Sequence, residues 1–458
     1  IRAHPLSRTL LSNARSATRS KTTLLSGAMQ SSSTMERPAD KYSPTYFLAS
    51  LGMGGIAVTF FMYPLFWVPH PGRTVPIFED IVAAWVKGDA SLQAAIVISM
   101  AGILSFAVLN LYTLAWNLRS YAAFKKSDAY AKLRQSHAES TLLAMPLTLA
   151  MSVNVVFIVG IVFIPRIWTV IEYLFPIAMT AFALITVHAF YLLSHFLGRV
   201  LTKGDEAPHN TFAQVTPAFA IAMIAVGFAA PAAMSSNPST VGASIVFSTA
   251  LGTFAIVYAV FAAISALSSM LKHGTSKESA PTLMIIIPIC TVLGIMFMRQ
   301  DHGLHYTYDA HTNAGETLVF LARMLSIQLA FLFLGGVVIF AHGYLDDFVF
   351  GSKTSAGSYA LVCPFVALSV MLHFFVNKGL VAAGVIAKYD PAYWFVTSIA
   401  LLSQAIAIAL VIRLNMQHFT PRQVQTAATK PAEDIEAAPE LDESRDGDAT
   451  DIAQGLSG

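Results

Sequence analysis

The sequence predicts an all-α polytopic membrane protein whose ten transmembrane helices form five hairpins. Three observations lead to this prediction. Hydrophobic residues make up 55% of the 458 residues and charged residues only 12%, whereas soluble domains carry roughly 25% charged residues. Ten apolar stretches each come close to or exceed the roughly 20 residues that cross the core of a bilayer. Proline, finally, falls mainly in the odd-numbered stretches.

The apolar stretches define the helices in chain order. The predicted spans are residues 46–68, 92–116, 142–164, 169–197, 211–233, 241–271, 281–298, 317–343, 357–376 and 391–412. Only helices and closed barrels satisfy their backbone polar groups in lipid, and runs this long and continuously apolar are helices. The connecting loops are too short for a second domain, so we expect one transmembrane domain over residues 44–416.

Helix-breaking residues mark the odd-numbered spans. The first span has Gly52, Gly54, Gly55 and Pro64, the third Pro146, the fifth Pro217, Gly227 and Pro231, the seventh Pro288 and Gly294, and the ninth Pro364. Among the even-numbered spans only the fourth has a proline in its interior, Pro176. Proline removes a backbone hydrogen bond and bends a helix, and the freed carbonyl must face protein or water. We therefore expect kinked odd-numbered helices around a central pore, with the even-numbered helices facing lipid.

The two ends of the chain differ in charge. Residues 1–34 are rich in Ser and Thr and carry five basic but no acidic residues, which is typical of an organellar transit peptide. The alternative, which we favour, is a mature protein that begins at Met29 or Met35. We expect residues 1–43 to be disordered or absent from the mature chain. The acidic, Ala-rich tail over 417–458 should be disordered.

Basic residues in the short loops predict the orientation of the helices. One side carries Arg119, Lys125, Lys126, Lys132, Arg134, Arg199, Lys203, Lys272, Lys277 and Lys353; the other carries Arg73, Lys87, Arg166, Arg299, Lys378 and Lys388. This bias of ten against six places both termini in the cytoplasm of a multi-pass protein of the plasma or inner membrane.

Short motifs near both ends of the membrane domain resemble a known family. They are Pro44-Thr45-Tyr46-Phe47 with Leu51-Gly52 after it, the basic connector between Trp116 and Pro146, and Tyr359-Ala360-Leu361-Val362-Cys363-Pro364. Over roughly residues 44–412 the chain resembles the tellurite-resistance and dicarboxylate transporter family, which includes the plant slow-type anion channels. The resemblance implies five helical hairpins around a pore, a homotrimer, and passage of small anions or monoanionic organic acids.

One departure from the family pattern concerns the pore. The resemblance implies a plugging phenylalanine before the proline, where this chain has Cys363. Phe365 projects about 200° away around the helix. The cysteine packs or lines the pore, or alternatively supports redox or soft-ion chemistry. The predicted pore and gate residues are Cys363, Pro364, Phe365, Gly52, Pro146, Pro217 and Pro288.

Ionisable residues within spans are costly and are therefore candidates for function. Arg323 either attracts an anion or anchors the helix at the interface by snorkelling. A rival mechanism on the same fold is a proton-coupled organic-acid transporter in which His373 or Glu316 carries the proton.

Histidines suggest two further sites. His188 and His195 lie seven residues apart and, with histidines of other spans, suggest a haem-binding redox protein, although interfacial hydrogen bonding is the simpler interpretation. His302, His305 and His311 lie in a predicted loop after the seventh span and suit a divalent metal. Their spacing matches no strong zinc pattern, so a pH-responsive mouth or an ordinary polar loop remains an alternative.

Other function classes lack their sequence signals. The net charge is +2, and no basic patch carries interleaved aromatic residues, so we expect no nucleic-acid partner. Walker, zinc-protease and nucleophile-elbow motifs do not occur. The two cysteines are predicted to be thiols. We therefore predict a channel or transporter without enzymatic activity or cofactor, whose partners are small anions and lipid; a membrane redox protein using Cys363 or haem is the alternative.

Overall fold

The computed structural model describes residues 42–203, 211–311 and 313–419. In these ranges ten helical spans are long and apolar enough to cross a membrane, and no strand occurs. They are Pro44–Trp67, Ala90–Phe124, His137–Phe163, Ile167–Thr202, Phe212–Met234, Pro238–His273, Lys277–Tyr308, Ala314–Ala341, Ala356–Val381 and Pro391–Phe419. All ten predicted spans are confirmed. The predicted terminal segments lie almost entirely outside the described residues.

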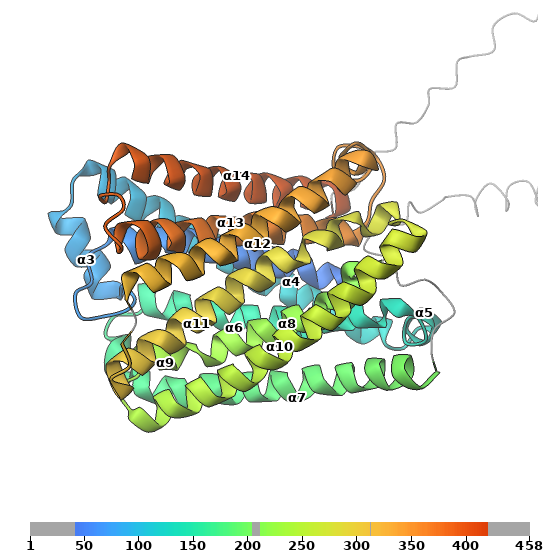
Figure 1. The fold of residues 1–458 in the computed structure, drawn as a ribbon, viewed down its shortest axis with the longest axis horizontal. Coiled ribbons are helices and arrows are strands. Elements are labelled where there is room, and N and C mark those ends of the chain that lie inside the picture. Colours follow the sequence, from blue (N-terminus) through green and yellow to red (C-terminus); the bar gives the residue numbers. More distant parts are fainter. Residues whose placement is uncertain (1–41, 204–210, 312, 420–458) are drawn as a thin grey trace, which may run out of the picture. The chain divides into compact units, whose positions relative to one another are not determined.

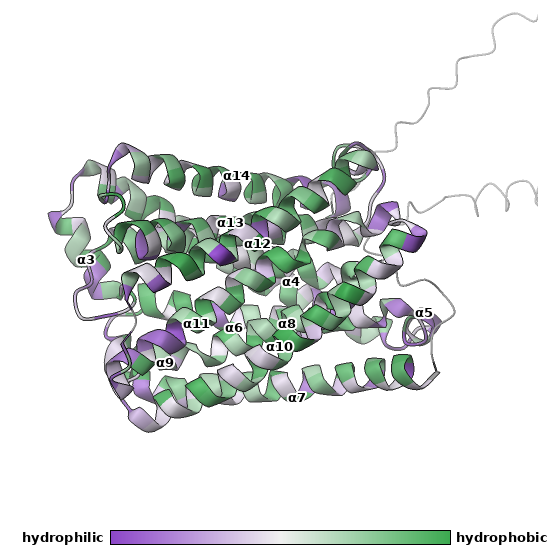
Figure 2. Cartoon of the chain, in the orientation of Figure 1, coloured by the Kyte–Doolittle hydropathy of each residue, from purple (hydrophilic) through white to green (hydrophobic). Residues whose placement is uncertain are grey.

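Figure 2 shows why these helices suit a bilayer. Hydrophobic residues run along the length of the bundle, whereas hydrophilic residues concentrate in the connections at its two ends. We name these ends after the short helices that lie there, α3 (Phe78–Lys87) and α5 (Asp128–Leu133). The chain is a multi-pass membrane protein.

The odd-numbered spans form a closed inner ring. Their α-helical parts are α2 (Phe47–Trp67), α6 (Ala144–Phe163), α8 (Thr216–Phe228), α11 (Ile286–Tyr308) and α13 (Val362–Phe374). Each contacts the next, and α13 returns to contact α2. The apolar windows of these spans are 56% to 89% buried, compared with 17% to 33% for the even-numbered spans. The predicted inner and outer sets of helices are therefore confirmed.

The even-numbered spans wrap this ring. They are α4 (Ala90–Phe124), α7 (Ile171–Lys203), α10 (Pro238–His273), α12 (Ala314–Ala341) and α14 (Pro391–Phe419). Each packs against its own hairpin partner in the ring and against a second inner helix, and Figure 1 shows α7 and α14 at opposite edges of the bundle. The five predicted hairpins are thus the units from which the bundle is built.

Glycines on the outer helices receive large side chains of the inner ring. A Cβ atom on Gly102 would lie 2.4 Å from the ring of Phe60. On Gly252 it would lie 2.6 Å from Met296. Because only glycine leaves this space, small residues set how closely the outer helices approach the ring, as is common in membrane bundles.

The prolines of the ring lie at changes of helix type, where the sequence predicted bends within helices. Short 3₁₀ helices, η3 (His137–Leu143), η5 (Phe212–Val215), η6 (Lys277–Ile285) and η8 (Ala356–Leu361), lead into α6, α8, α11 and α13. The second or third residue of each following α-helix is Pro146, Pro217, Pro288 or Pro364. Proline is tolerated in the first turn of an α-helix because its missing N–H is not needed there.

The burial of the prolines differs between the inner ring and the outer helices. Pro64 lies inside α2, and Pro231 is the second residue of the short helix α9 (Ala230–Met234), which follows a break after α8. All eight prolines of the odd-numbered spans are buried, whereas Pro176 of α7 is exposed. The breaks in the backbone therefore face protein, as the hydrocarbon environment requires.

Close packing between α7 and α8 gives a stability prediction. Gly227→Ala should destabilise the protein by about 1–3 kcal/mol, as overpacked cores do, because the new Cβ would lie 2.2 Å from the ring of Phe182. Phe182 is 3% exposed and packs against Phe228, so its ring must shift and give up part of this packing to admit the new methyl group. Unfolding of the purified protein in mixed micelles measures the change.

The matched control for this prediction is Gly198→Ala on α7, the helix that carries Phe182. A Cβ there has no atom within 4 Å. Since alanine favours helix over glycine by up to about 1 kcal/mol, this variant should be neutral or stabilised. Equal losses in both variants would contradict the packing argument.

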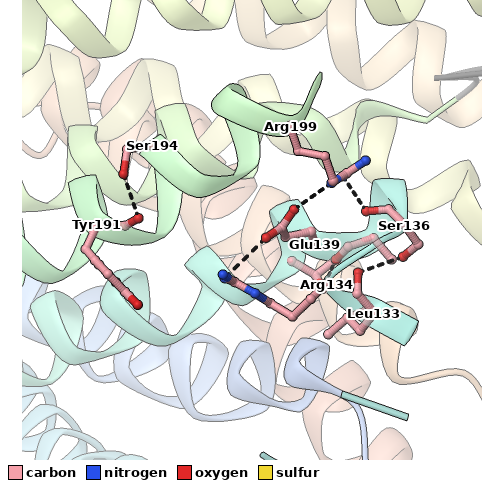
Figure 3. Close-up of polar contacts among 9 residues, drawn as sticks. Leu133, Arg134, Ser136, Glu139, Tyr191, Ser194 and Arg199 are labelled. Carbon is pink, nitrogen blue, oxygen red and sulfur yellow. Dashed lines mark hydrogen bonds and ion pairs between the residues drawn. The ribbon is translucent and has the colours of Figure 1, made fainter. Parts of the chain in front are cut away.

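A buried cluster of charged side chains lies at the α5 end of the bundle (Figure 3). Glu139 of η3 is 2% exposed. Its carboxylate accepts a hydrogen bond from Arg199 Nε at 3.0 Å and lies 3.2 Å from Arg134 Nη1. Arg199 Nη2 also donates to the carbonyl of Ser136 at 2.7 Å. The cluster joins the end of α7 to the start of the third span.

Candidate functional site

A cavity of about 1340 Å³ lies inside the ring of inner helices. All five inner helices line it, and α7 adds part of one wall. Its lining also includes residues of the connections at the α3 end, among them His70, Thr74, Asn313 and Tyr389. The cavity therefore reaches the surface at the α3 end of the bundle, which we call its mouth.

The cavity ends inside the bundle before it reaches the α5 end. The five inner helices run in the same direction, and the first residue that each contributes to the lining is Leu51, Met151, Phe219, Pro288 or Cys363. One turn earlier on each helix or its 3₁₀ lead lie Phe47, Leu147, Val215, Met284 and Tyr359, each at most 4% exposed. We call the level of these five buried residues, at which the cavity ends, the closing layer.

Between the closing layer and the mouth the lining is apolar. Phenylalanine, methionine, valine and isoleucine make up most of it, and in the described chain no charged side chain lines this part. Two polar side chains do line it. The Thr291 hydroxyl donates to the carbonyl of Ala367 at 3.0 Å and accepts from Gln328 Nε2 at 2.6 Å, and Asn154 Nδ2 donates to the carbonyl of Ala150 at 3.0 Å. We call this part of the cavity the apolar chamber.

Basic side chains gather at the mouth. Arg73, Arg299, Lys378 and Lys388 line it, together with two acidic residues, Asp301 and Glu316. Arg73 is neutralised because it forms an ion pair with Asp80. Partial removal from water lowers the pKa of the Lys388 amine below its ordinary value, and Lys388 Nζ donates to the carbonyl of Phe66 at 2.8 Å.

Arg299 is the basic residue nearest to the apolar chamber. It is half-buried, and its Nη1 donates to the carbonyl of Val226 at 2.7 Å. No carboxylate of the described chain forms an ion pair with it. Because it lies eleven residues after Pro288 on α11, it stands about 16 Å above the closed end of the cavity.

The end of α8 within the fifth span explains what holds the Arg299 side chain in place. α8 ends at Phe228, so the carbonyl of Val226 belongs to the last turn, whose carbonyls lack helical partners and carry partial negative charge. Pro231, which has no N–H, stands just beyond this break. The sequence of the fifth span thereby creates an acceptor that holds the guanidinium at the edge of the cavity.

The structure brings some of the predicted pore residues together and excludes others. Gly52, Pro288 and Cys363 line the cavity at its closed end. Four other predicted pore or gate residues do not line it: Pro146, Pro217, Pro364 and Phe365. The prolines are buried at the 3₁₀–α junctions, and Phe365 turns toward α14, where Ser403 Oγ donates to its carbonyl at 2.9 Å.

The three predicted ionisable candidates lie in different places. Glu316 lines the mouth, but its backbone N–H and carboxylate bond to the side chain of Asn313 and cap α12. Arg323 is exposed on α12 and does not line the cavity. His373 is fully buried outside the cavity lining, among the rings of Tyr63, Phe66 and Trp67.

The histidines after the seventh span lie partly on a helix, where the sequence predicted a loop. α11 continues to Tyr308, so His302 and His305 belong to its last turns. His302 packs on Tyr306, His305 Nδ1 lies 2.8 Å from the carbonyl of Ala310, and the ring centroids of His305 and His311 are 6.0 Å apart. No group of three metal-binding side chains occurs in the described ranges, so the predicted metal site is not supported.

The histidines of the haem alternative lie on the outer layer. His188 and His195 are on α7, and the ring of His195 packs on Tyr191 with centroids 4.8 Å apart. Neither lines the cavity.

Sequence reasoning missed Arg299, Lys378 and Lys388 as site residues and treated them as loop charges. The missed signal was the continuation of helix-compatible sequence beyond the apolar run of the seventh span, which extends α11 past residue 298. Comparison with models of protein families, with curated proteins and with solved structures gave no match.

The position of Cys363 predicts selective chemical blocking. Cys363 lines the closed end of the cavity, whereas Cys290 is buried outside the lining. A small methanethiosulfonate that enters at the mouth should label Cys363 and reduce solute flux through the protein. Cys363→Ser should abolish this block and Cys290→Ser should preserve it, as measured by flux into proteoliposomes after labelling is verified by mass spectrometry. Full flux after complete labelling of Cys363 would contradict the prediction.

Proposed function

We propose that this protein is a membrane channel or transporter that passes small anions or organic acids through the central cavity. The observation that carries the proposal is the cavity inside the ring of inner helices, with Arg299 held at its mouth and unpaired with any described carboxylate. A cation in this position attracts anions, and the low polarity around it strengthens the attraction.

The closing layer fits a path that is shut at rest. For a solute to cross, the inner helices must open a path at the level of Phe47 and Leu147. The 3₁₀–α junctions that surround this level are natural places for such a change, because 3₁₀ turns within helical spans often mark hinges. No covalent chemistry and no cofactor are part of this proposal.

The resemblance to the tellurite-resistance and dicarboxylate transporter family supports the same function. We extend the proposal to the assembly and location that this resemblance and the loop charges imply, which are a homotrimer in the plasma or inner membrane with both termini in the cytoplasm.

Flux assays in proteoliposomes test the proposal. Chloride, nitrate, sulfite, tellurite and malate are offered in turn to vesicles with the purified chain and to protein-free vesicles. We expect at least one anion to enter faster with the protein, and potassium to enter no faster. If every anion enters at the protein-free rate under imposed voltages of both signs and at several pH values, the proposal fails.

A further inference from the structure

The apolar chamber is large and lacks the groups that bind a bare ion. Its depth from the closed end to Arg299 is about 16 Å, and the whole cavity of about 1340 Å³ exceeds the roughly 300–1,000 Å³ of typical small-molecule pockets. Selectivity filters for inorganic ions use rings of carbonyls or charges. Here the described lining below Arg299 offers neither a charged side chain nor a ring of polar side chains.

Methionine is frequent in the lining of the cavity. Six methionines line the cavity: Met62, Met151, Met179, Met223, Met234 and Met298. Their thioethers are flexible and polarisable, so a surface rich in them adapts to apolar bodies of different shapes and contacts aromatic rings favourably. A small hydrated anion gains nothing from such a wall and would lose its hydration there.

We propose that the cavity binds amphipathic organic anions. The acidic group lies at Arg299, Lys378 and Lys388, and an alkyl or aryl body extends into the apolar chamber. This inference rests on the proposed function and names the class of solute that the cavity selects. It accounts for a cationic mouth directly above an apolar chamber, an arrangement that matches the two ends of such a molecule.

A series of alkanesulfonates tests the inference. Sulfonates remain charged at neutral pH, so they do not cross lipid as neutral acids, and the series from methane- to hexanesulfonate changes only the apolar body. Affinity should rise roughly fourfold for each methylene that enters the chamber. It is measured by calorimetry on the full chain in nanodiscs and by inhibition of nitrate or methanesulfonate flux in proteoliposomes, with protein-free nanodiscs as the correction for lipid partition.

Two variants locate the binding. Met223→Gln places an amide in the chamber at nearly constant volume, and Val58→Thr places a hydroxyl there at constant shape. In either folded variant hexanesulfonate should bind roughly two- to tenfold more weakly, because the added polar group faces the alkyl chain even where it finds a local partner, such as Asn154 Nδ2 beside residue 223. The matched control is Met416→Gln on α14, which is 59% exposed and outside the cavity, and should bind as the parent does.

The outcomes separate this inference from the proposed function. A small anion that crosses while affinity stays flat along the series overturns the inference and leaves the proposed function intact. Absence of any flux together with a rising affinity overturns transport but supports the site. A rising affinity that Met223→Gln and Val58→Thr leave unchanged places the binding elsewhere and overturns the inference.

Discussion

Replacing Glu139 with alanine should destabilise the membrane domain by about 3–5 kcal/mol, the usual loss when one partner of a buried ion pair is removed. Glu139 is 2% exposed, and the side chain of Arg199 that binds it is only 16% exposed. Without the carboxylate, Arg199 and Arg134 both lose this buried ionic partner, while Arg199 keeps its hydrogen bond to Ser136. Unfolding of the purified protein in micelles, and its yield from membranes, measure the loss.

Two comparisons make this prediction specific. Asp347 forms ion pairs with Lys277 at 2.8 Å and Lys353 at 2.7 Å near the surface at the α5 end, and Asp347→Asn should cost far less because exposed pairs contribute little. The double variant Glu139→Leu/Arg199→Met replaces the two most buried members of the cluster with apolar side chains and should recover part of the stability, because Arg134 is 23% exposed and can turn its charge to water. A loss for Glu139→Ala no larger than that for Asp347→Asn would contradict the role of the cluster.

The fold was largely predictable because the hydrocarbon core of a membrane permits few kinds of structure. Each span must be long, apolar and internally hydrogen-bonded, so all ten could be found from the sequence. Prolines add a second signal, since a broken backbone hydrogen bond is tolerated only against protein. Pro176 shows the limit of this rule, because it is exposed on α7.

The candidate site was only partly predictable because it depends on which way each side chain points and on contacts between residues that are far apart in the sequence. Pro146 and Pro364 were assigned to the pore from their effect on a helix, yet they are buried at 3₁₀–α junctions away from the cavity lining. Glu139 and Arg199 are 60 residues apart, and no local pattern links them. Arg299 was counted with the loops because hydropathy falls there, although the helix continues and its polar end faces the mouth.

Replacing Arg299 with glutamine should lower the rate of anion entry at low concentration by about tenfold to a hundredfold. A hydrogen bond to a charged group contributes about 1.5–3 kcal/mol, and each 1.4 kcal/mol corresponds to a factor of ten. The amide of glutamine remains able to donate toward the carbonyl of Val226, so the fold should survive. Arg299→Lys keeps the charge and should retain most of the flux. Initial rates in proteoliposomes, together with the unfolding temperature of each variant, provide the measurement.

Arg323→Gln is the decisive comparison, because it removes the same charge from an exposed position on α12 outside the cavity. If anions enter along the cavity, this variant should match the parent while Arg299→Gln falls behind. The difference should be largest at low ionic strength, since salt screens the attraction at a partly exposed mouth. If both variants lose flux equally, the charge acts through the general field of the protein, and the cavity is not the path. If only Arg323→Gln loses flux, the anion approaches along the outer helices, and the ring of inner helices serves packing alone.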